Sequence, residues 1–181
     1  MPPAEAATEM TGILRMLARR RIVLGFVAGV VTLILGRPSW PSWEAGVLVA
    51  VVGEAIRIWS AGHLEKSREV TRSGPYRWTP HPLYVGSSII ALGAVVAARS
   101  VTVAVVVTIY IAATLTAAIA TEEAFLRRAF GDAYDRYRRS SAEPMVRRFS
   151  AGRAMRNREY RAVMGLVAGF ALLALKIVLS I

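Results

Sequence analysis

The sequence predicts an all-α fold, a multi-pass membrane bundle of about five transmembrane helices. Hydrophobic residues make up 55% of the 181 residues, and the mean hydropathy is +0.44. The apolar residues are gathered in long runs separated by shorter, arginine-rich segments, which is the pattern of helices that cross a bilayer. The length suits a single domain, residues 1–181, with no room for a soluble catalytic domain beside the membrane part.

The net charge of +11 comes mostly from arginines outside the apolar runs. Such a charge can indicate nucleic-acid binding, but the excess of basic residues in cytoplasmic loops of membrane proteins explains it more simply. We therefore expect no nucleic-acid partner. The chain has no cysteine and only two histidines, which excludes disulfides and thiolate chemistry and predicts no metal site.

The first expected span covers about residues 18–35, where three consecutive arginines precede an apolar run. A signal peptide also begins this way, but no small-residue cleavage site ends the run and further spans follow. A turn containing Trp40 and Trp43 leads into the second span, about residues 44–64. Tryptophan is enriched at membrane interfaces, so this turn is expected at the bilayer surface.

The third and fourth spans cover about residues 82–98 and 101–120, and only two residues separate them. So short a joint predicts a helical hairpin in the membrane. Gly86, Gly93 and the many alanines of this region would let the helices pack closely. The fifth span, residues 162–181, is long enough to cross the membrane once more.

The basic residues gather before the first span, in residues 63–81 and in residues 121–161, where eleven arginines lie. The positive-inside rule places all three segments in the cytoplasm, so the N-terminus is expected inside and the C-terminus outside a cell membrane. In the first half of residues 121–161 apolar residues recur at helical spacing. This predicts an amphipathic helix at the membrane surface, which Gly131 would interrupt.

One charged pair lies inside the second span. Glu54 and Arg57 are three residues apart and therefore share one face of the helix. A charge in the bilayer costs at least about 2.5 kcal/mol on insertion scales, so such residues are candidates for function. The pair is either catalytic or a structural ion pair, and both interpretations stay open.

Residues 74–86 combine three prolines with aromatic residues and a histidine. Each proline restricts the residue before it to extended conformations, and no helix can run through the stretch until Pro82, which suits the first turn of the third span. His81 then stands on a stiff turn, and Glu122 and Glu123 return to the same side of the membrane after the hairpin. A structural histidine and a carboxylate pair at a helix start are the ordinary alternatives.

The segment Ser73-Gly-Pro-Tyr-Arg-Trp-Thr-Pro-His-Pro-Leu-Tyr-Val-Gly86, the hairpin, and then Glu122-Glu-Ala-Phe-Leu-Arg-Arg-Ala-Phe-Gly-Asp-Ala-Tyr-Asp-Arg-Tyr137 resemble the isoprenylcysteine carboxyl methyltransferase family. That family is related to the membrane phospholipid methyltransferases. The resemblance covers about residues 53–146 and not the last span. It implies an integral membrane methyltransferase with a cytoplasmic pocket for S-adenosylmethionine and a lipid-like or other hydrophobic acceptor.

The resemblance also implies which residues bind the cofactor: Val70, Thr71, Tyr76, His81, Tyr84, Glu122 and Glu123. Tyr134 and Tyr137 would close the pocket. The chemistry agrees, because the cofactor has an ammonium that needs a carboxylate, a carboxylate that needs donors and an adenine that needs an aromatic or apolar slot. Trp78, Tyr76 or Phe130 could form that slot. No Gly-x-Gly-x-x-Gly follows a strand, which excludes a Rossmann-type methyltransferase.

Two positions depart from the family pattern. Pro80 stands where many members have an arginine before the histidine, and Ala118 stands where eukaryotic carboxyl methyltransferases have an arginine that faces the substrate carboxylate. Arg57 is the nearest alternative cation, and we expect Glu54 to neutralise it. Because an unpaired carboxylate near the bilayer is costly, the acceptor is expected to be neutral or cationic at its reacting end.

Two other functions remain open. One is a membrane reductase of the steroid-reductase type, which would bind NADPH in the same pocket. The other is a non-enzymatic helical membrane partner protein whose arginine-rich segment binds anionic lipids.

Overall fold

The computed structural model describes residues 3–143 and 145–179. All regular structure in this part of the chain is helical, which confirms the predicted all-α class. The elements are α1 (Pro3–Leu35), α2 (Trp40–His63), the 3₁₀ turn η1 (Gly74–Arg77), α3 (Pro82–Ala98), α4 (Val101–Phe130), α5 (Asp132–Arg138), α6 (Ala151–Arg156) and α7 (Tyr160–Val178).

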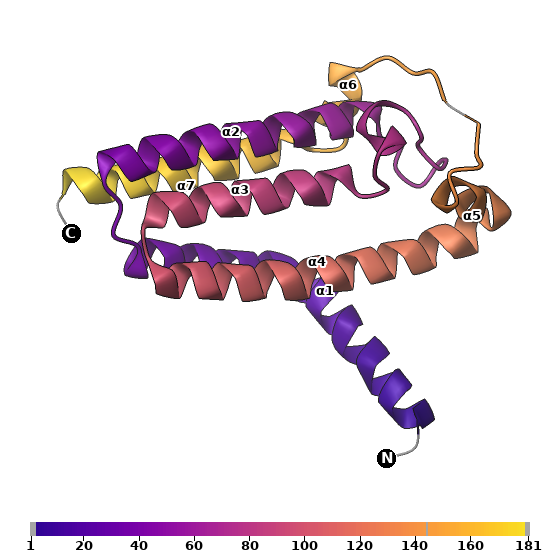
Figure 1. Ribbon diagram of the computed structural model, residues 1–181, viewed down its shortest axis with the longest axis horizontal. Helices are drawn as coiled ribbons and strands as arrows, with labels where there is room; N and C mark the ends of the chain where they lie inside the picture. The colour runs from indigo at the N-terminus through magenta and orange to yellow at the C-terminus, as the bar shows by residue number, and fades with distance from the viewer. Residues whose placement is uncertain (1–2, 144, 180–181) are drawn as a thin grey trace.

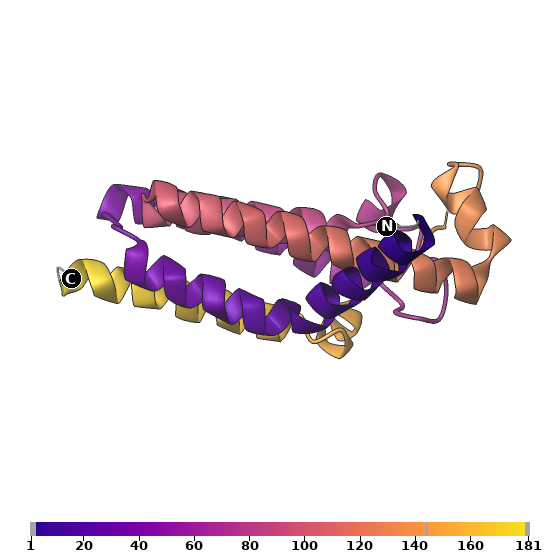
Figure 2. The same ribbon diagram turned by 90° about the horizontal axis from the view of Figure 1, so that it is seen from below.

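The long helices run side by side as a membrane bundle (Figure 1). Among the described residues, α2, α4 and α7 are long and apolar enough to cross a membrane, whereas α3 is apolar but has only 17 residues. Five segments run between the two ends of the bundle, as predicted, but only these three meet the criteria of length and hydropathy. Helix α1 is longer than expected, and Figures 1 and 2 show that its N-terminal part leaves the bundle at an angle.

The helix boundaries follow local signals. Helix α2 begins at Trp40, earlier than predicted, because Ser39 caps it and Pro41 occupies its first turn. The Ser39 amide donates a hydrogen bond of 2.9 Å to the Ser42 hydroxyl. Helix α3 begins at Pro82, as predicted, since proline at the first helical position has no amide to satisfy.

The hairpin between α3 and α4 is confirmed. Arg99 adopts a left-handed conformation with φ of 46°, and the Ser100 side chain caps α4 by accepting a hydrogen bond from the Val103 amide. Helix α4 then continues without a break to Phe130, so the separate surface helix expected from residue 121 is wrong: nothing in this stretch interrupts the backbone hydrogen bonds. Gly131, with φ of 45°, does mark the predicted junction with α5.

Glycines hold α2 and α3 close together along their whole length. A β-carbon added at Gly53 would lie 2.7 Å from the Gly86 carbonyl oxygen, and one at Gly93 would lie 2.6 Å from the Gly46 carbonyl oxygen. No larger residue fits such contacts. The sequence predicted that Gly86 and Gly93 would bring the third and fourth spans together, and this is wrong in its partner, because both glycines pack against α2, where Gly53 and Gly46 face them.

Helix α7 runs along the bundle and is fixed to two other helices at the end away from the loops. The Trp43 indole donates a hydrogen bond of 2.8 Å to the Phe170 carbonyl, which joins α7 to α2. The Lys176 ammonium donates to the Leu33 carbonyl at 2.7 Å and so satisfies the last turn of α1. These contacts fix α7 between two helices that come much earlier in the chain.

Candidate active site

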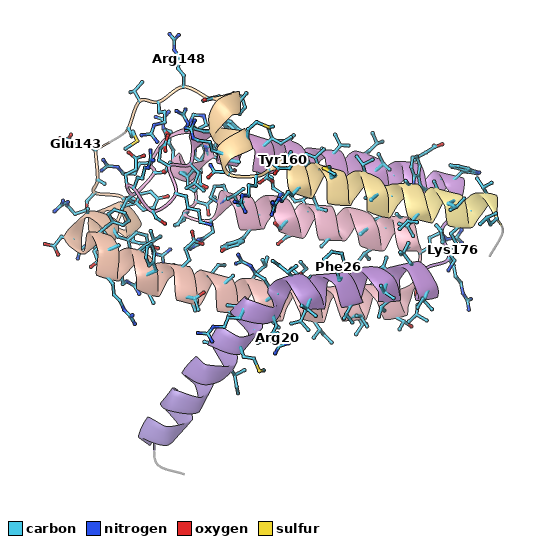
Figure 3. All side chains as sticks on the ribbon, turned by 180° about the vertical axis from the view of Figure 1, so that it is seen from behind. Arg20, Phe26, Glu143, Arg148, Tyr160 and Lys176 are labelled. Atoms are coloured by element: carbon cyan, nitrogen blue, oxygen red, sulfur yellow. The ribbon has the colours of Figure 1, made fainter. Side chains whose placement is uncertain are left out.

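A cavity of about 670 Å³ lies at the end of the bundle where the long loops gather. Its wall is formed by α1, α2, α3, α4 and α5, by η1 and the loop before it, and by the segment that precedes α7. Figure 3 shows that polar side chains crowd this end, on the side of Arg148 and Glu143, whereas Lys176 marks the opposite end.

Most of the residues predicted from the sequence lie on the wall of this one cavity: Arg57, Val70, Thr71, Tyr76, His81, Tyr84 and Glu122, together with Tyr134 and Tyr137. Glu54 and Glu123 are not part of the wall and stand behind it. Segments up to 138 residues apart in sequence, from Arg21 to Glu159, therefore meet at one site.

His81 sits at the start of α3, between the two carboxylates of the acidic pair. Its Nε2 is 3.2 Å from Glu123 Oε1, and its Nδ1 is 3.8 Å from Glu122 Oε2. The ring stacks on Tyr84, with 5.7 Å between ring centroids. The Nδ1 atom is buried and makes no hydrogen bond within the protein, so it is available to a ligand.

The two acidic residues differ in their surroundings. Glu123 is held by His81 and by two arginines, with Arg138 Nη1 at 3.4 Å and Arg127 Nη2 at 3.6 Å from its oxygens. Glu122 lies on the cavity wall, with a long contact to His81 and the Tyr84 hydroxyl nearby. This division makes Glu123 a positioning residue for His81 and leaves Glu122 as the carboxylate that a ligand can reach.

Three further tyrosines line the same cavity as His81. The Tyr137 hydroxyl donates a hydrogen bond of 2.6 Å to the Tyr76 carbonyl, whereas the buried hydroxyls of Tyr76 and Tyr134 have no partner. Burial raises the pKa of Tyr76, and it raises the pKa of Tyr134 and of Tyr137 to about 12. All three hydroxyls therefore stay protonated at neutral pH and can donate hydrogen bonds.

Arg57 is neutralised mainly by a residue that the sequence did not indicate. Its Nε lies 2.7 Å from Glu159 Oε1, compared with 3.6 Å from Glu54 Oε2, and its Nη1 donates to the Ser87 hydroxyl at 2.5 Å. The expected pairing of Arg57 with Glu54 is present, but Glu159 lies closer and is an additional partner. Glu159 was missed because it lies 102 residues away and outside the region of resemblance, so no local pattern linked the two.

The segment before α7 fastens the loop that covers the cavity. Arg147 Nη1 lies 2.5 Å from Glu69 Oε1, and the hydrogen bond with Glu69 raises the pKa of Arg147. The Asn157 amide donates to the carbonyls of Ala61 and Leu64, both at 2.9 Å. These contacts tie residues 145–159 to the end of α2, and nothing in the sequence had predicted them.

Two aromatic residues proposed for an adenine slot do not line the cavity. Trp78 is 75% exposed and packs edge-on against Trp59, with ring centroids 5.5 Å apart, and Phe130 is also absent from the wall. Tyr76, the third candidate, does line the cavity, and Phe125 on α4 is a further aromatic residue of the wall. Ala118 lies on the wall too, so the missing arginine leaves an apolar surface there.

Comparisons with known proteins indicate the family. Residues 43–133 match the family model described as phospholipid methyltransferase, which is half of the chain and contains Arg57, His81 and the acidic pair. No solved structure matches the chain.

Two curated relatives are similar over 67% of the chain. The nickel-cobalt-cadmium resistance protein NccN of Alcaligenes xylosoxydans xylosoxydans is 33% identical over 136 residues, and the cobalt-zinc-cadmium resistance protein CzcN of Cupriavidus metallidurans is 32% identical over 134 residues. The matched regions span 61% and 60% of those proteins. Within residues 3–143 and 145–179, no group of three or more histidine, aspartate or glutamate side chains could hold a metal ion.

Proposed function

The chain belongs to the phospholipid methyltransferase family, and from this premise we propose that it is an integral membrane methyltransferase. We propose S-adenosylmethionine as its methyl donor and a lipid-like or otherwise hydrophobic molecule as its acceptor. The observation that carries this proposal is the convergence of His81, Tyr84 and Glu122 on one cavity whose buried polar atoms lack partners.

The residues of the wall fit this cofactor. Glu122 can pair with the ammonium of the methionine part, while His81 Nδ1 and the hydroxyls of Tyr76 and Tyr134 are free hydrogen-bonding groups for its carboxylate or ribose. When bound, S-adenosylmethionine supplies an electrophilic methyl group on a positively charged sulfur. Val70 and Thr71, from the loop that covers the cavity, would close the site above it.

The opposite wall supports a hydrophobic acceptor. Helix α4 contributes Ile111, Leu115 and Ala118, and α1 contributes Ile22, all of them apolar side chains. Direct displacement at a methyl group needs little acid–base assistance from the protein. The main tasks of these residues are therefore to align the acceptor with the donor and to exclude water.

The names of the curated relatives refer to resistance to nickel, cobalt, zinc and cadmium. We propose methyl transfer rather than metal binding as the activity of this chain, because its described residues offer no cluster of metal ligands. A contribution to metal resistance would then come through the methylated product.

We also propose that the protein is a multi-pass protein of the cell membrane, with the N-terminus in the cytoplasm and the C-terminus outside. The distribution of arginines supports this orientation. The fold also supports it, because α1 lines the cavity where it joins the bundle, with Arg21, Ile22 and Gly25, and α7 ends at the opposite end (Figure 1). Reporters fused after Ile181 and inserted near Ser140 should report opposite sides. Both reporters on one side would contradict the proposed orientation.

Calorimetric titration of the purified protein tests the activity class. We expect S-adenosylmethionine and S-adenosylhomocysteine to bind and NADPH to give no heat, and we expect radiolabelled methyl groups to be transferred to lipid-extracted acceptors. Binding of NADPH alone would instead favour the steroid-reductase type. Binding of neither would leave a non-enzymatic membrane partner protein.

A further inference from the structure

A second polar cluster lies on the cavity wall, away from His81. Arg57 of α2, Ser87 of α3 and Glu159 at the start of α7 all line the cavity, and the guanidinium joins the other two. His81, Tyr84 and Ser87 follow one another at intervals of three along α3, so they share one face of that helix. Six residues correspond to roughly 9 Å of helix, which places this cluster farther along the cavity than His81.

The cluster contains more negative than positive groups. Glu159 lies 2.7 Å from Arg57 Nε, and Glu54 approaches the same nitrogen at 3.6 Å from behind the wall. Both carboxylates belong to buried residues, with 6% and 5% of their surfaces exposed. The single guanidinium is thus already paired, and it also donates to Ser87. It has no free charge to offer to an anionic ligand.

We propose that Glu159 determines which acceptors this cavity accepts. Its carboxylate receives a hydrogen bond from the head group of the acceptor, which must be an amine or a hydroxyl, and it repels a carboxylate or phosphate at that position. Charge repulsion against the wrong ligand is a common source of specificity. This inference rests on the proposed function, because it assumes that the same cavity receives the acceptor.

The position of Glu159 in the chain supports this role without reference to the family. It lies outside residues 43–133, which match the family model, and it comes from the segment that residues such as Asn157 fasten to the end of α2. Its place before the first turn of α7 also suits a carboxylate, since the start of a helix is positively polarised. The C-terminal segment therefore adds a selective wall to the family's core.

Three ligands that differ only in head group test the proposal: octylamine, octanol and octanoate. Each is titrated at pH 7 into the purified protein in neutral detergent. We expect octylamine to bind best and octanoate worst. In Glu159→Gln, which removes the charge with little change of volume, the preference for octylamine over octanoate should fall by about tenfold to a hundredfold, the value of a charge-assisted hydrogen bond. If Glu159→Gln loses more affinity for octanol than for octylamine, the acceptor is a hydroxyl compound. If it loses more affinity for octylamine, the acceptor is an amine.

Glu44→Gln is the matched control, because Glu44 is exposed near the start of α2, at the opposite end of the bundle. It should leave the preference unchanged. If Glu159→Gln lowers the unfolding temperature strongly, the double variant Arg57→Gln, Glu159→Gln removes both charges and should fold without any preference between octylamine and octanoate. An unaltered preference in either variant, or a wild type that binds octanoate best, would overturn the proposal.

Titration of S-adenosylmethionine into the same samples separates this inference from the proposed function. We expect Glu159→Gln to bind the cofactor within about twofold of the wild type, since Glu122 and His81 are untouched. A wild type that does not bind S-adenosylmethionine contradicts the proposed function and leaves the head-group result standing. Normal cofactor binding without any effect on head-group preference contradicts the role of Glu159 alone.

Discussion

The two ends of the bundle are built from the same helices, yet they use their polar groups differently. At the end formed by the start of α2 and the end of α7, side-chain donors are matched to carbonyl groups of neighbouring helices. Lys176 donates to the Leu33 carbonyl, Trp43 to the Phe170 carbonyl and Ser42 to the Ala97 carbonyl. These hydrogen bonds join neighbouring helices and satisfy the side-chain donors within the protein.

At the cavity end the matching is incomplete. The described buried side-chain atoms that lack a hydrogen-bond partner belong to Glu54, Arg72, Tyr76, His81 and Tyr134. All lie at the cavity or beside the residues that line it. An unpartnered polar group inside a protein is unfavourable by about 1–3 kcal/mol, so a group of them at one site is best explained by a ligand that satisfies them.

Helix α2 belongs to both ends and shows how one element serves two purposes. In its first half, Gly46 packs so closely against Gly93 of α3 that a β-carbon would not fit between the two helices. Its second half carries Arg57 into the cavity wall and ends under the segment that holds Asn157. Changes in the first half should alter stability, and changes near the second should alter binding.

The largest effect is expected at Glu122. Glu122→Gln removes the carboxylate that we propose for the cofactor's ammonium but keeps the side-chain volume. Affinity for S-adenosylmethionine should fall by about tenfold to a hundredfold, corresponding to ~1.5–3 kcal/mol, with little change in the unfolding temperature. Calorimetric titration measures this, with Glu44→Gln as the control at the other end. Equal affinities in the two variants would remove Glu122 from the site.

The reverse pattern is expected at Gly46. A β-carbon there would lie 2.5 Å from the Gly93 carbonyl oxygen and 2.6 Å from the Ala97 β-carbon. Gly46→Val should therefore lower the free energy of unfolding by about 1–3 kcal/mol through overpacking. Gly165→Val is the matched control, because nothing lies within 4 Å of a β-carbon there. If the two variants unfold at the same temperature, the close contact of α2 and α3 is not needed for stability.

A smaller effect is expected from alkaline pH. Burial raises the pKa of Tyr137 to about 12, above the value near 10 of an exposed tyrosine. Because the pKa of Tyr137 is higher in the folded than in the unfolded state, its contribution to the free energy of unfolding is fully present below about pH 10. This contribution is lost as the pH rises towards about 12. Tyr137→Phe should flatten this part of the profile of unfolding temperature against pH. Identical profiles for the wild type and the variant would show that Tyr137 does not carry the dependence.

Sequence reasoning succeeded where the signal is local. Pro82 at the start of α3, the two-residue joint before α4 and Gly131 after it each constrain the backbone within a few residues, and the structure confirms all three. The resemblance placed His81 and Glu122 on one site because it carried long-range information that periodicity lacks. Three of the five expected spans meet the criteria for crossing a membrane.

The contacts that the sequence did not predict join residues far apart in the chain. The side of a turn to which Trp78 points depends on Trp59, which comes from another helix. The pairing of Arg57 with Glu159 joins residues 102 positions apart, and an isolated glutamate among arginines gives no hint of its partner. The loop contacts of Arg147 with Glu69 are of the same kind. Such pairings are decided by which helix ends meet, and the sequence specifies this only through the whole fold.

Hydrogen–deuterium exchange with and without S-adenosylmethionine tests the contrast between the two ends most directly. We expect the cofactor to slow exchange in residues 64–84 and 121–137, which surround His81 and Glu122, and to leave residues 36–46 and 93–104 unchanged. Protection at the closed end of the bundle, or saturating cofactor without protection around His81, would contradict the assignment of the cavity as the cofactor site.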